Sequence, residues 1–195
     1  MDYPLQLSFK LMALTPQIYV RDAQGNLRMY VKQKMFKLRE NVTVFADEAQ
    51  QQPLYHIKAD RVIDFRARYH FTTADGREVG SVRRKGRRSL WSAHYEIMSG
   101  DEVVLLIRER NPWAKVGDAL FGEIPVLGIL AGYVFHPSYS VTTPDGATEV
   151  LRASKQPALW EGKYTIEKLA EVTLPAEGLS VLSLLMMLLL ERRRG

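Results

Sequence analysis

Apolar and polar residues alternate along most of the chain up to about residue 170, with the period of two that half-buried β-strands show. Leu5-Gln6-Leu7-Ser8-Phe9-Lys10-Leu11 carries this pattern clearly. A Gln24-Gly25-Asn26 turn between Ile18–Val20 and Leu27–Val31 predicts a hairpin. The other predicted strands are Val42–Phe45, Leu54–Lys58, Arg68–Thr73, Glu78–Arg84, His94–Met98, Val103–Arg108, Tyr139–Thr143, Glu149–Ser154 and Tyr164–Leu169.

Turn-forming residues separate these strands. Asp75-Gly76, Ser99-Gly100-Asp101 and Pro144-Asp145-Gly146 tolerate the positive φ that tight hairpin turns require. Many short strands at regular spacing favour a sandwich or barrel over βαβ units. No repeat or Ser/Gly/Pro-rich linker divides the chain, so we expect one domain over residues 1–195.

Two stretches interrupt the strand pattern, and the first runs over about residues 111–135. Asn111-Pro112-Trp113 is typical of the first turn of a short helix, where proline is tolerated. The apolar run Val126–Phe135 follows it, so a helical or irregular crossover and a buried strand are both open for this region. Glu123 and Pro125 argue against a membrane span here.

The second interruption, Leu179–Leu190, is apolar on every face of a helix. Pro175 and Glu177 suit a helix N-terminus and Arg192–Arg194 suit its C-terminus, which predicts a helix over about 177–193. The apolar run would be roughly 18 Å long at 1.5 Å per residue, whereas a bilayer core needs about 30 Å. We therefore expect a core helix surrounded by the strands, and no transmembrane span.

Composition and charge narrow the class of protein. Of the 195 residues, 46% are apolar and 25% charged, which is enough for a sizeable core. Cysteine is absent, which removes disulfides, thiolate nucleophiles and Cys-based zinc sites. The net charge of +5 favours anionic partners such as phospholipid headgroups. The first residues, Met1–Leu5, lack the features of a secretory signal, so a cytoplasmic location is expected.

Taken in order, four features resemble the LURP-one-related proteins of the tubby-like C-terminal superfamily. They are the hairpin Thr73–Lys85, the crossover from Asn111-Pro112-Trp113 to Phe121-Gly122-Glu123-Ile124-Pro125, Gly132-Tyr133 leading to Pro137, and the closing Leu-rich helix. The resemblance implies a mainly β fold, a closed antiparallel barrel of about 12 strands wrapped around a buried C-terminal helix. The superfamily is also related to phospholipid scramblase domains, which are membrane-associated. Its tubby members resemble phosphoinositide-binding modules.

The strongest candidate site is a basic cluster after the strand Glu78–Val82. Its five cations are Arg83, Arg84, Lys85, Arg87 and Arg88. Clustered guanidinium groups bind phosphates bidentately, and in tubby proteins a similar basic hairpin contributes to headgroup binding. Strand alternation predicts that Arg83 and Lys85 share one face while Arg84 lies on the other. The alternative is a solvated loop whose charges protect a hairpin edge from aggregation.

Other candidate chemistry finds no support in the sequence. His56, His70, His94 and His136 fall in separate strands or loops, and no nucleophile elbow, phosphate-binding glycine loop or zinc motif is present. We therefore expect no enzyme activity, no catalytic residues, no metal and no cofactor. No second basic strand that would complete a headgroup pocket is evident either.

Two functions stay open at this point. The first is a non-catalytic module that binds anionic phospholipid or phosphoinositide headgroups through the basic hairpin, at the membrane periphery. The second is a structural or protein-interaction scaffold whose partner is unknown. Nucleic acid is not expected as a partner, because no nucleic-acid-binding module is recognisable.

Overall fold

The computed structural model describes residues 1–10, 17–32, 41–61, 67–85, 93–110, 137–157 and 162–192. The predicted crossover at about 111–135 lies outside these residues. The same holds for Arg87 and Arg88 of the basic cluster.

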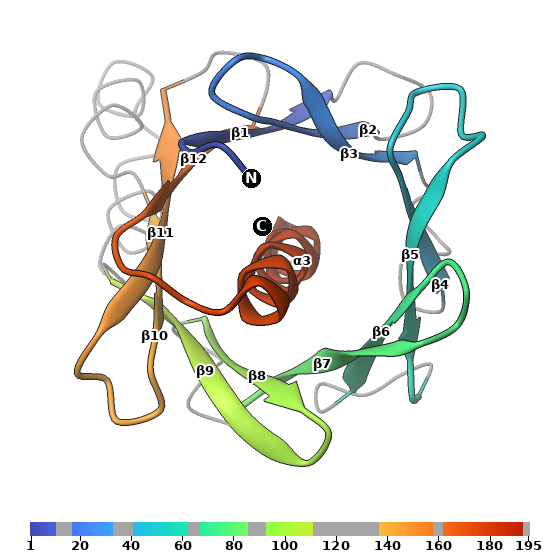
Figure 1. Ribbon diagram of the computed structural model, residues 1–195. Coiled ribbons are helices and arrows are strands. Elements are labelled where there is room, and N and C mark those ends of the chain that lie inside the picture. The colour runs from blue at the N-terminus through green and yellow to red at the C-terminus, as the bar shows by residue number, and fades with distance from the viewer. Residues whose placement is uncertain are drawn as a thin grey trace, which may run out of the picture.

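Within the described residues, twelve strands form one closed antiparallel barrel (Figure 1). Neighbours along the chain pair with each other, and β1 closes the barrel by pairing with β12. All twelve predicted strands are confirmed, with ends that shift by one or two residues. They are β1 (Leu5–Lys10), β2 (Gln17–Arg21), β3 (Leu27–Lys32), β4 (Asn41–Phe45), β5 (Pro53–Ala59), β6 (Arg68–Thr73), β7 (Glu78–Arg84), β8 (His94–Ser99), β9 (Glu102–Glu109), β10 (Ser138–Thr142), β11 (Glu149–Gln156) and β12 (Gly162–Lys168).

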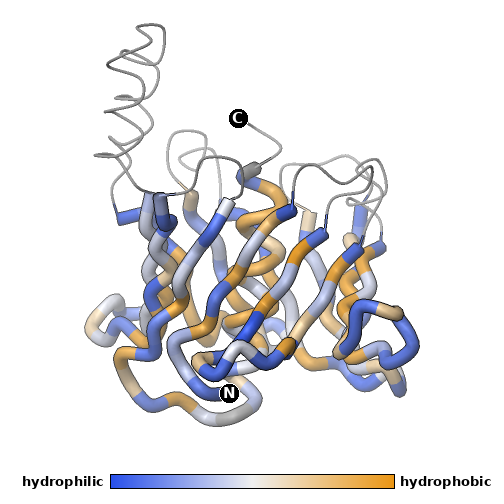
Figure 2. The backbone as a smooth tube through the Cα atoms, turned by 90° about the horizontal axis from the view of Figure 1, so that it is seen from above, coloured by the Kyte–Doolittle hydropathy of each residue, from blue (hydrophilic) through white to orange (hydrophobic). Residues whose placement is uncertain are grey.

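The alternation of the sequence becomes the inside and outside of the barrel. In β1, Leu5, Leu7 and Phe9 are buried in the lumen, while Gln6 and Lys10 are exposed and Ser8 is half-buried. Figure 2 shows the same alternation of hydropathy along the other strands. Because the described strands close into a barrel, the sheet that they form has no open edge strand that could recruit another chain.

One helix, α3 (Leu174–Arg192), fills the lumen, as the sequence predicts (Figure 1). It begins three residues earlier than expected, with Pro175 in its first turn, where a proline has no hydrogen bond to lose. Leu184 and Met187 are completely buried and Leu188 is 2% exposed. Within the described part of the chain, no helix combines the length and apolarity needed to span a membrane.

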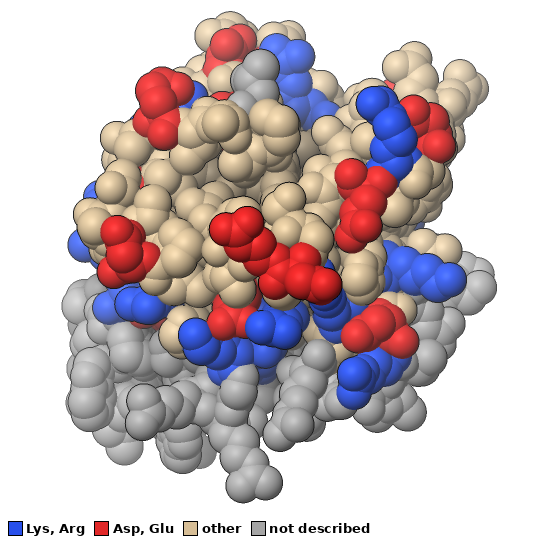
Figure 3. Space-filling view, turned by 60° about the horizontal axis from the view of Figure 1, so that its bottom comes forward, with Lys and Arg blue, Asp and Glu red and all other residues tan. Residues whose placement is uncertain are grey.

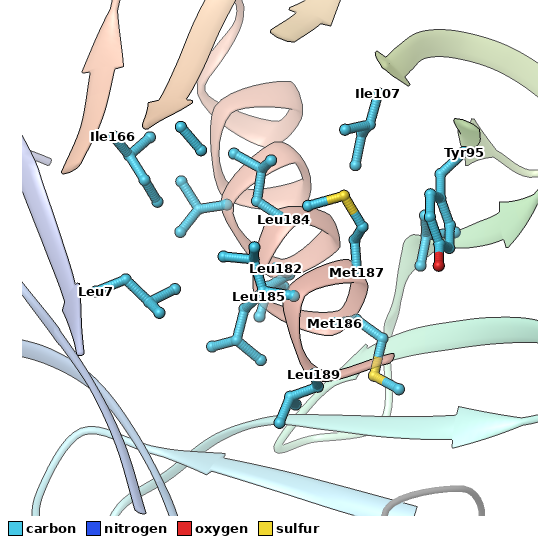
Figure 4. Close-up of a cluster of buried hydrophobic side chains, with 14 of the residues drawn as sticks. Leu7, Tyr95, Ile107, Ile166, Leu182, Leu184, Leu185, Met186, Met187 and Leu189 are labelled. Atoms are coloured by element: carbon cyan, nitrogen blue, oxygen red, sulfur yellow. The ribbon is translucent and has the colours of Figure 1, made fainter. Parts of the chain in front are cut away.

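Side chains from around the barrel point at this helix. Figure 4 shows Leu7 of β1, Tyr95 of β8 and Ile107 of β9 directed toward the leucines and methionines of α3. The helix lies nearest β7, β8 and β9. Gly80 of β7 permits this approach, because a Cβ there would lie 2.8 Å from Cδ2 of Leu179 and 2.5 Å from the carbonyl oxygen of Met98.

The barrel has two ends, which lie at the top and the bottom of Figure 2. We call the end at which α3 begins the N-end and the end at which α3 finishes the C-end. The described hairpin turns lie at the N-end, and the glycines of the predicted turns have positive φ there, as in Gly76 at 85°. β7 finishes at the C-end, so Arg83, Arg84 and Lys85 all lie near that end.

Replacing Leu184 by alanine should cost about 2–5 kcal/mol in the free energy of unfolding, because the barrel cannot collapse onto the cavity left behind. Leu169→Ala is the matched control, since the Leu169 side chain is 44% exposed and its loss should cost less than about 0.5 kcal/mol. Chemical denaturation measures both. Equal costs for the two variants would contradict the burial of α3.

Gly80→Ala should destabilise the protein more than Gly76→Ala does. Both positions have positive φ, at 147° and 85°, but only an added Cβ at Gly80 meets other atoms within 4 Å. Backbone strain of about 1–3 kcal/mol applies at both sites, and the clash with Met98 and Leu179 adds to it at Gly80. Both substitutions lie in the β6–β7 hairpin, and a comparison of the denaturation midpoints of the two variants checks this order.

Candidate functional site

Arg83 and Lys85 lie side by side on the outer face of β7, around one buried carboxylate of β8. Nε of Arg83 lies 2.7 Å from Oε2 of Glu96, and Nζ of Lys85 lies 3.0 Å from Oε1 of the same residue. The Glu96 side chain is only 9% exposed, while those of Arg83 and Lys85 are 44% and 52% exposed. The three charges sum to +1, so Glu96 fixes the two cations in place without neutralising both.

Arg84 lies on the opposite face of β7, which confirms the predicted alternation. Its Nη2 lies 3.3 Å from Oε1 of Glu191 in the last turns of α3, and both side chains are at most 10% exposed. Tyr95 Oη donates a hydrogen bond of 2.8 Å to the same Glu191 oxygen. The guanidinium carbon of Arg84 also lies 5.7 Å from the Tyr95 ring centroid. Arg84 therefore holds the end of the helix and is not available on the outer surface.

β9 adds cations to the outer face that holds Arg83 and Lys85, and the sequence pointed to no such second basic strand. Arg108 is the cross-strand partner of His94, whose carbonyl in turn accepts a hydrogen bond of 2.8 Å from the backbone N–H of Lys85. Strands are about 4.8 Å apart, so Lys85 and Arg108 flank His94 across about 10 Å. Arg110 extends the row past the end of β9, and its Nη1 lies 3.6 Å from Glu149.

We call Arg83, Lys85, Arg108 and Arg110 the outer basic face. All four side chains belong to exposed residues on β7, on β9 or directly after them. Figure 3 looks onto this side of the barrel and shows most of its Lys and Arg side chains gathered along the border with the residues that are not described. Sequence reasoning did not single out Arg108 or Arg110: Arg108 was only the last polar position of the predicted strand Val103–Arg108, and Arg110 lay beyond its end. Their nearness to β7 depends on pairing through β8.

The electrostatics of the outer basic face show a local excess of positive charge. Partial burial lowers the pKa of His94, and the nearby Arg108 and Lys85 lower it further, against the opposing effect of Glu96. Burial alone would raise the pKa of Glu96, but hydrogen bonds from Lys85 and Arg83 outweigh it and hold this pKa below its usual value. Glu96 therefore stays ionised and His94 favours its neutral form at neutral pH.

Such an arrangement can hold an anion, because exposed guanidinium and ammonium groups donate charge-assisted hydrogen bonds to phosphate or carboxylate oxygens. The other described histidines lie apart from it: Nδ1 of His56 is 3.3 Å from Thr43 Oγ1, and Nδ1 of His70 is 3.7 Å from Glu78. Among the described residues, no three His, Asp or Glu side chains come together as they would to hold a metal ion.

The lowered pKa of His94 predicts how stability changes with pH. The pKa of His94 in the folded protein lies below the ordinary 6.5. Neutral His94 therefore makes its full contribution to the free energy of unfolding above pH 6.5, and this contribution is lost as the pH falls below that value. The denaturation midpoint of the wild type should therefore drop between about pH 7 and pH 5.5, and His94→Gln should reduce this drop. Parallel pH profiles for the two proteins would contradict the assignment.

A matched control comes from the same row of side chains. The pKa of Glu96 is lowered from 4.5. Ionised Glu96 therefore makes its full contribution to the free energy of unfolding above pH 4.5, and this contribution is lost only in more acidic solution. Glu96→Gln should therefore keep the drop in the denaturation midpoint between about pH 7 and pH 5.5, because it removes an effect that raises the pKa of His94, although it lowers stability throughout.

Comparison with known proteins agrees with the architecture. The structure is similar to an X-ray structure of a protein from Arabidopsis thaliana, with a TM-score of 0.51 and 12% sequence identity. The similarity covers 98% of this chain and 93% of the other, and at this identity it shows the fold alone. No curated protein matches the chain. The profile described as LURP-one-related matches residues 27–167, well over half of the sequence, so the protein belongs to the LURP-one-related family.

Proposed function

We propose that the protein is a non-catalytic binding module that recognises anionic phospholipid or phosphoinositide headgroups. The contact set is the outer basic face, Arg83, Lys85, Arg108 and Arg110. Arg87 and Arg88, which lie outside the described residues, belong to the proposed set on sequence grounds. On this proposal the protein works in the cytoplasm as a peripheral membrane protein.

One observation carries the proposal. Four exposed cations lie on one barrel face, on β7, on β9 or directly after them, and two of them, Arg108 and Lys85, add to the lowering of the His94 pKa that partial burial chiefly causes. Each basic residue near an anionic membrane surface contributes about 1 kcal/mol of attraction. Phosphate oxygens are good partners for guanidinium groups, which bind them through two parallel hydrogen bonds.

The buried Glu96 supports such a role by holding the cations in position. Long, flexible side chains lose conformational entropy when they bind a ligand. Arg83 and Lys85 have already lost part of this conformational entropy before a ligand binds, because each pairs with the Glu96 carboxylate. Their remaining N–H donors stay available to a phosphate group, since a guanidinium carries five donors and an ammonium three.

The second candidate is a structural or protein-interaction scaffold whose partner is unknown. The observation that favours it is the same ion-pair cluster, because Arg83–Glu96–Lys85 links β7 to β8 and needs no ligand to do so. In that case the outer basic face only keeps the barrel soluble. The two candidates differ in whether neutralising Arg108 and Arg110 changes binding to vesicles.

Sedimentation with phosphatidylcholine vesicles that contain phosphatidylserine tests the proposal. The wild type should bind these vesicles, bind less as salt rises, and not bind pure phosphatidylcholine. The variant Arg108→Gln/Arg110→Gln should bind roughly thirty-fold more weakly, because two charges worth about 1 kcal/mol each are removed.

The matched control removes two cations from the N-end, in Arg21→Gln/Arg77→Gln, and should bind about as well as the wild type. Both variants keep Glu96 and its partners, so neither exposes an uncompensated buried charge. Equal binding by the wild type and Arg108→Gln/Arg110→Gln would show that the outer basic face is not the lipid site. The scaffold would then be the better explanation.

A further inference from the structure

Exposed charges are divided between the two ends of the barrel. In the described part of the C-end, the exposed cations come from seven strands or from the residues directly after them. By backbone position they are Lys10, Lys32, Lys58, Arg61, Arg83, Lys85, Arg108, Arg110, Lys155 and Lys163, and of these the Arg110 side chain extends back along the barrel to Glu149 at the start of β11. Asp60 is the exposed acidic residue in the same described region.

The N-end has the opposite charge. Its exposed acidic residues in the described ranges are Asp2, Glu48, Asp75, Glu78, Asp101, Glu102, Asp145, Glu167 and Glu171. Its exposed cations there, Arg28 and Arg77, both pair with acidic side chains: Arg28 with Asp22 at 2.8 Å and Arg77 with Asp75 at 2.8 Å. The charge difference therefore runs along the barrel axis.

The dipole of α3 explains only part of this division. A helix carries about half a positive charge at its N-terminus and half a negative charge at its C-terminus, and the effect is confined to the end turns. Glu177 at the start and Arg84 at the end of α3 fit that requirement, and both are inside the barrel. The exposed cations of the C-end lie outside the barrel wall, so stabilisation of the helix does not account for them.

The cations also surround the barrel. In the strand order β2 stands six strands from β8 in either direction, so β1 and β3 lie diametrically opposite β7 and β9. Lys10 of β1 and Lys32 of β3 thus carry positive charge to the side farthest from the outer basic face. A strand of six residues is about 20 Å long, well beyond the screening length of about 8 Å in physiological salt. The two ends therefore act on their surroundings separately.

From this ring of charge we infer that the barrel docks end-on to an anionic bilayer, with its C-end toward the lipid and its N-end toward the solvent. The inference rests on the proposed function for the nature of the ligand, and it adds the orientation and the extent of the contact. The outer basic face is then one sector of a basic ring. The acidic N-end is repelled by the same surface, which excludes the inverted orientation.

The absence of cysteine makes the orientation directly measurable, because a single introduced cysteine can be labelled without side reactions. β11 offers a matched pair: Thr148 directly before its start at the N-end, and Gln156 at its C-end. Each of Thr148→Cys and Gln156→Cys is labelled with a fluorophore and mixed with phosphatidylcholine–phosphatidylserine vesicles that carry a headgroup quencher.

The label at position 156 should be quenched when the protein binds, while the label at position 148 should not. Quenching of both labels to the same degree, or of position 148 alone, would overturn the end-on orientation. Either result would still count as vesicle binding, so it would leave the proposed function standing.

A second measurement separates the ring from the local site. Lys10→Gln/Lys32→Gln should weaken vesicle binding roughly thirty-fold, as Arg108→Gln/Arg110→Gln does, because both pairs belong to the ring. If only the Arg108/Arg110 variant loses affinity, the contact is a side-on patch and the inference is wrong. If the wild type binds no anionic vesicle, or binds only oligonucleotides, the proposed function and the orientation fail together.

Discussion

A helix that is apolar on every face is stable in water only where protein surrounds it, and α3 meets this condition inside its own barrel. The twelve strands in turn need something to fill a lumen lined by residues such as Leu7, Ile107 and Ile166. Each part thus removes the other from water, and neither has a polar face toward the lumen that would let it stand alone. The absence of a side chain at Gly80 lets the helix approach the wall at β7.

This mutual burial involves only the inner face of the barrel wall, and β7 shows how one strand serves both faces. Arg84 turns inward and fixes the last turns of α3 through Glu191, while its neighbours Arg83 and Lys85 turn outward around Glu96. Three adjacent cations therefore have two different duties. Charge on the inner face belongs to the stability of the barrel, and charge on the outer face is where recognition can be sought.

The sequence predicted the strands and the buried helix because their periods and turn glycines are local signals. It also predicted the alternation of Arg83, Arg84 and Lys85, which follows from strand geometry alone. It could not predict that Glu96 meets Arg83 or that Arg108 lies beside His94, because cross-strand partners depend on register. A bulge between Ile97 and Met98 shifts that register by one residue, and the pattern of apolar positions does not reveal where such a bulge falls.

The closing pair of the barrel joins the first strand to the last, with Leu5 opposite Ile166. During synthesis on the ribosome, β1 is made before the other strands of the described barrel, and one of its edges has no partner until β12 follows. The apolar lumen stays open for the same time, because α3 follows β12. Contacts between such distant parts of a chain form slowly, and unpaired edges attract other chains in the meantime. Until β12 and α3 have been made, the nascent chain therefore exposes a strand edge and an apolar surface of the kind that chaperones protect.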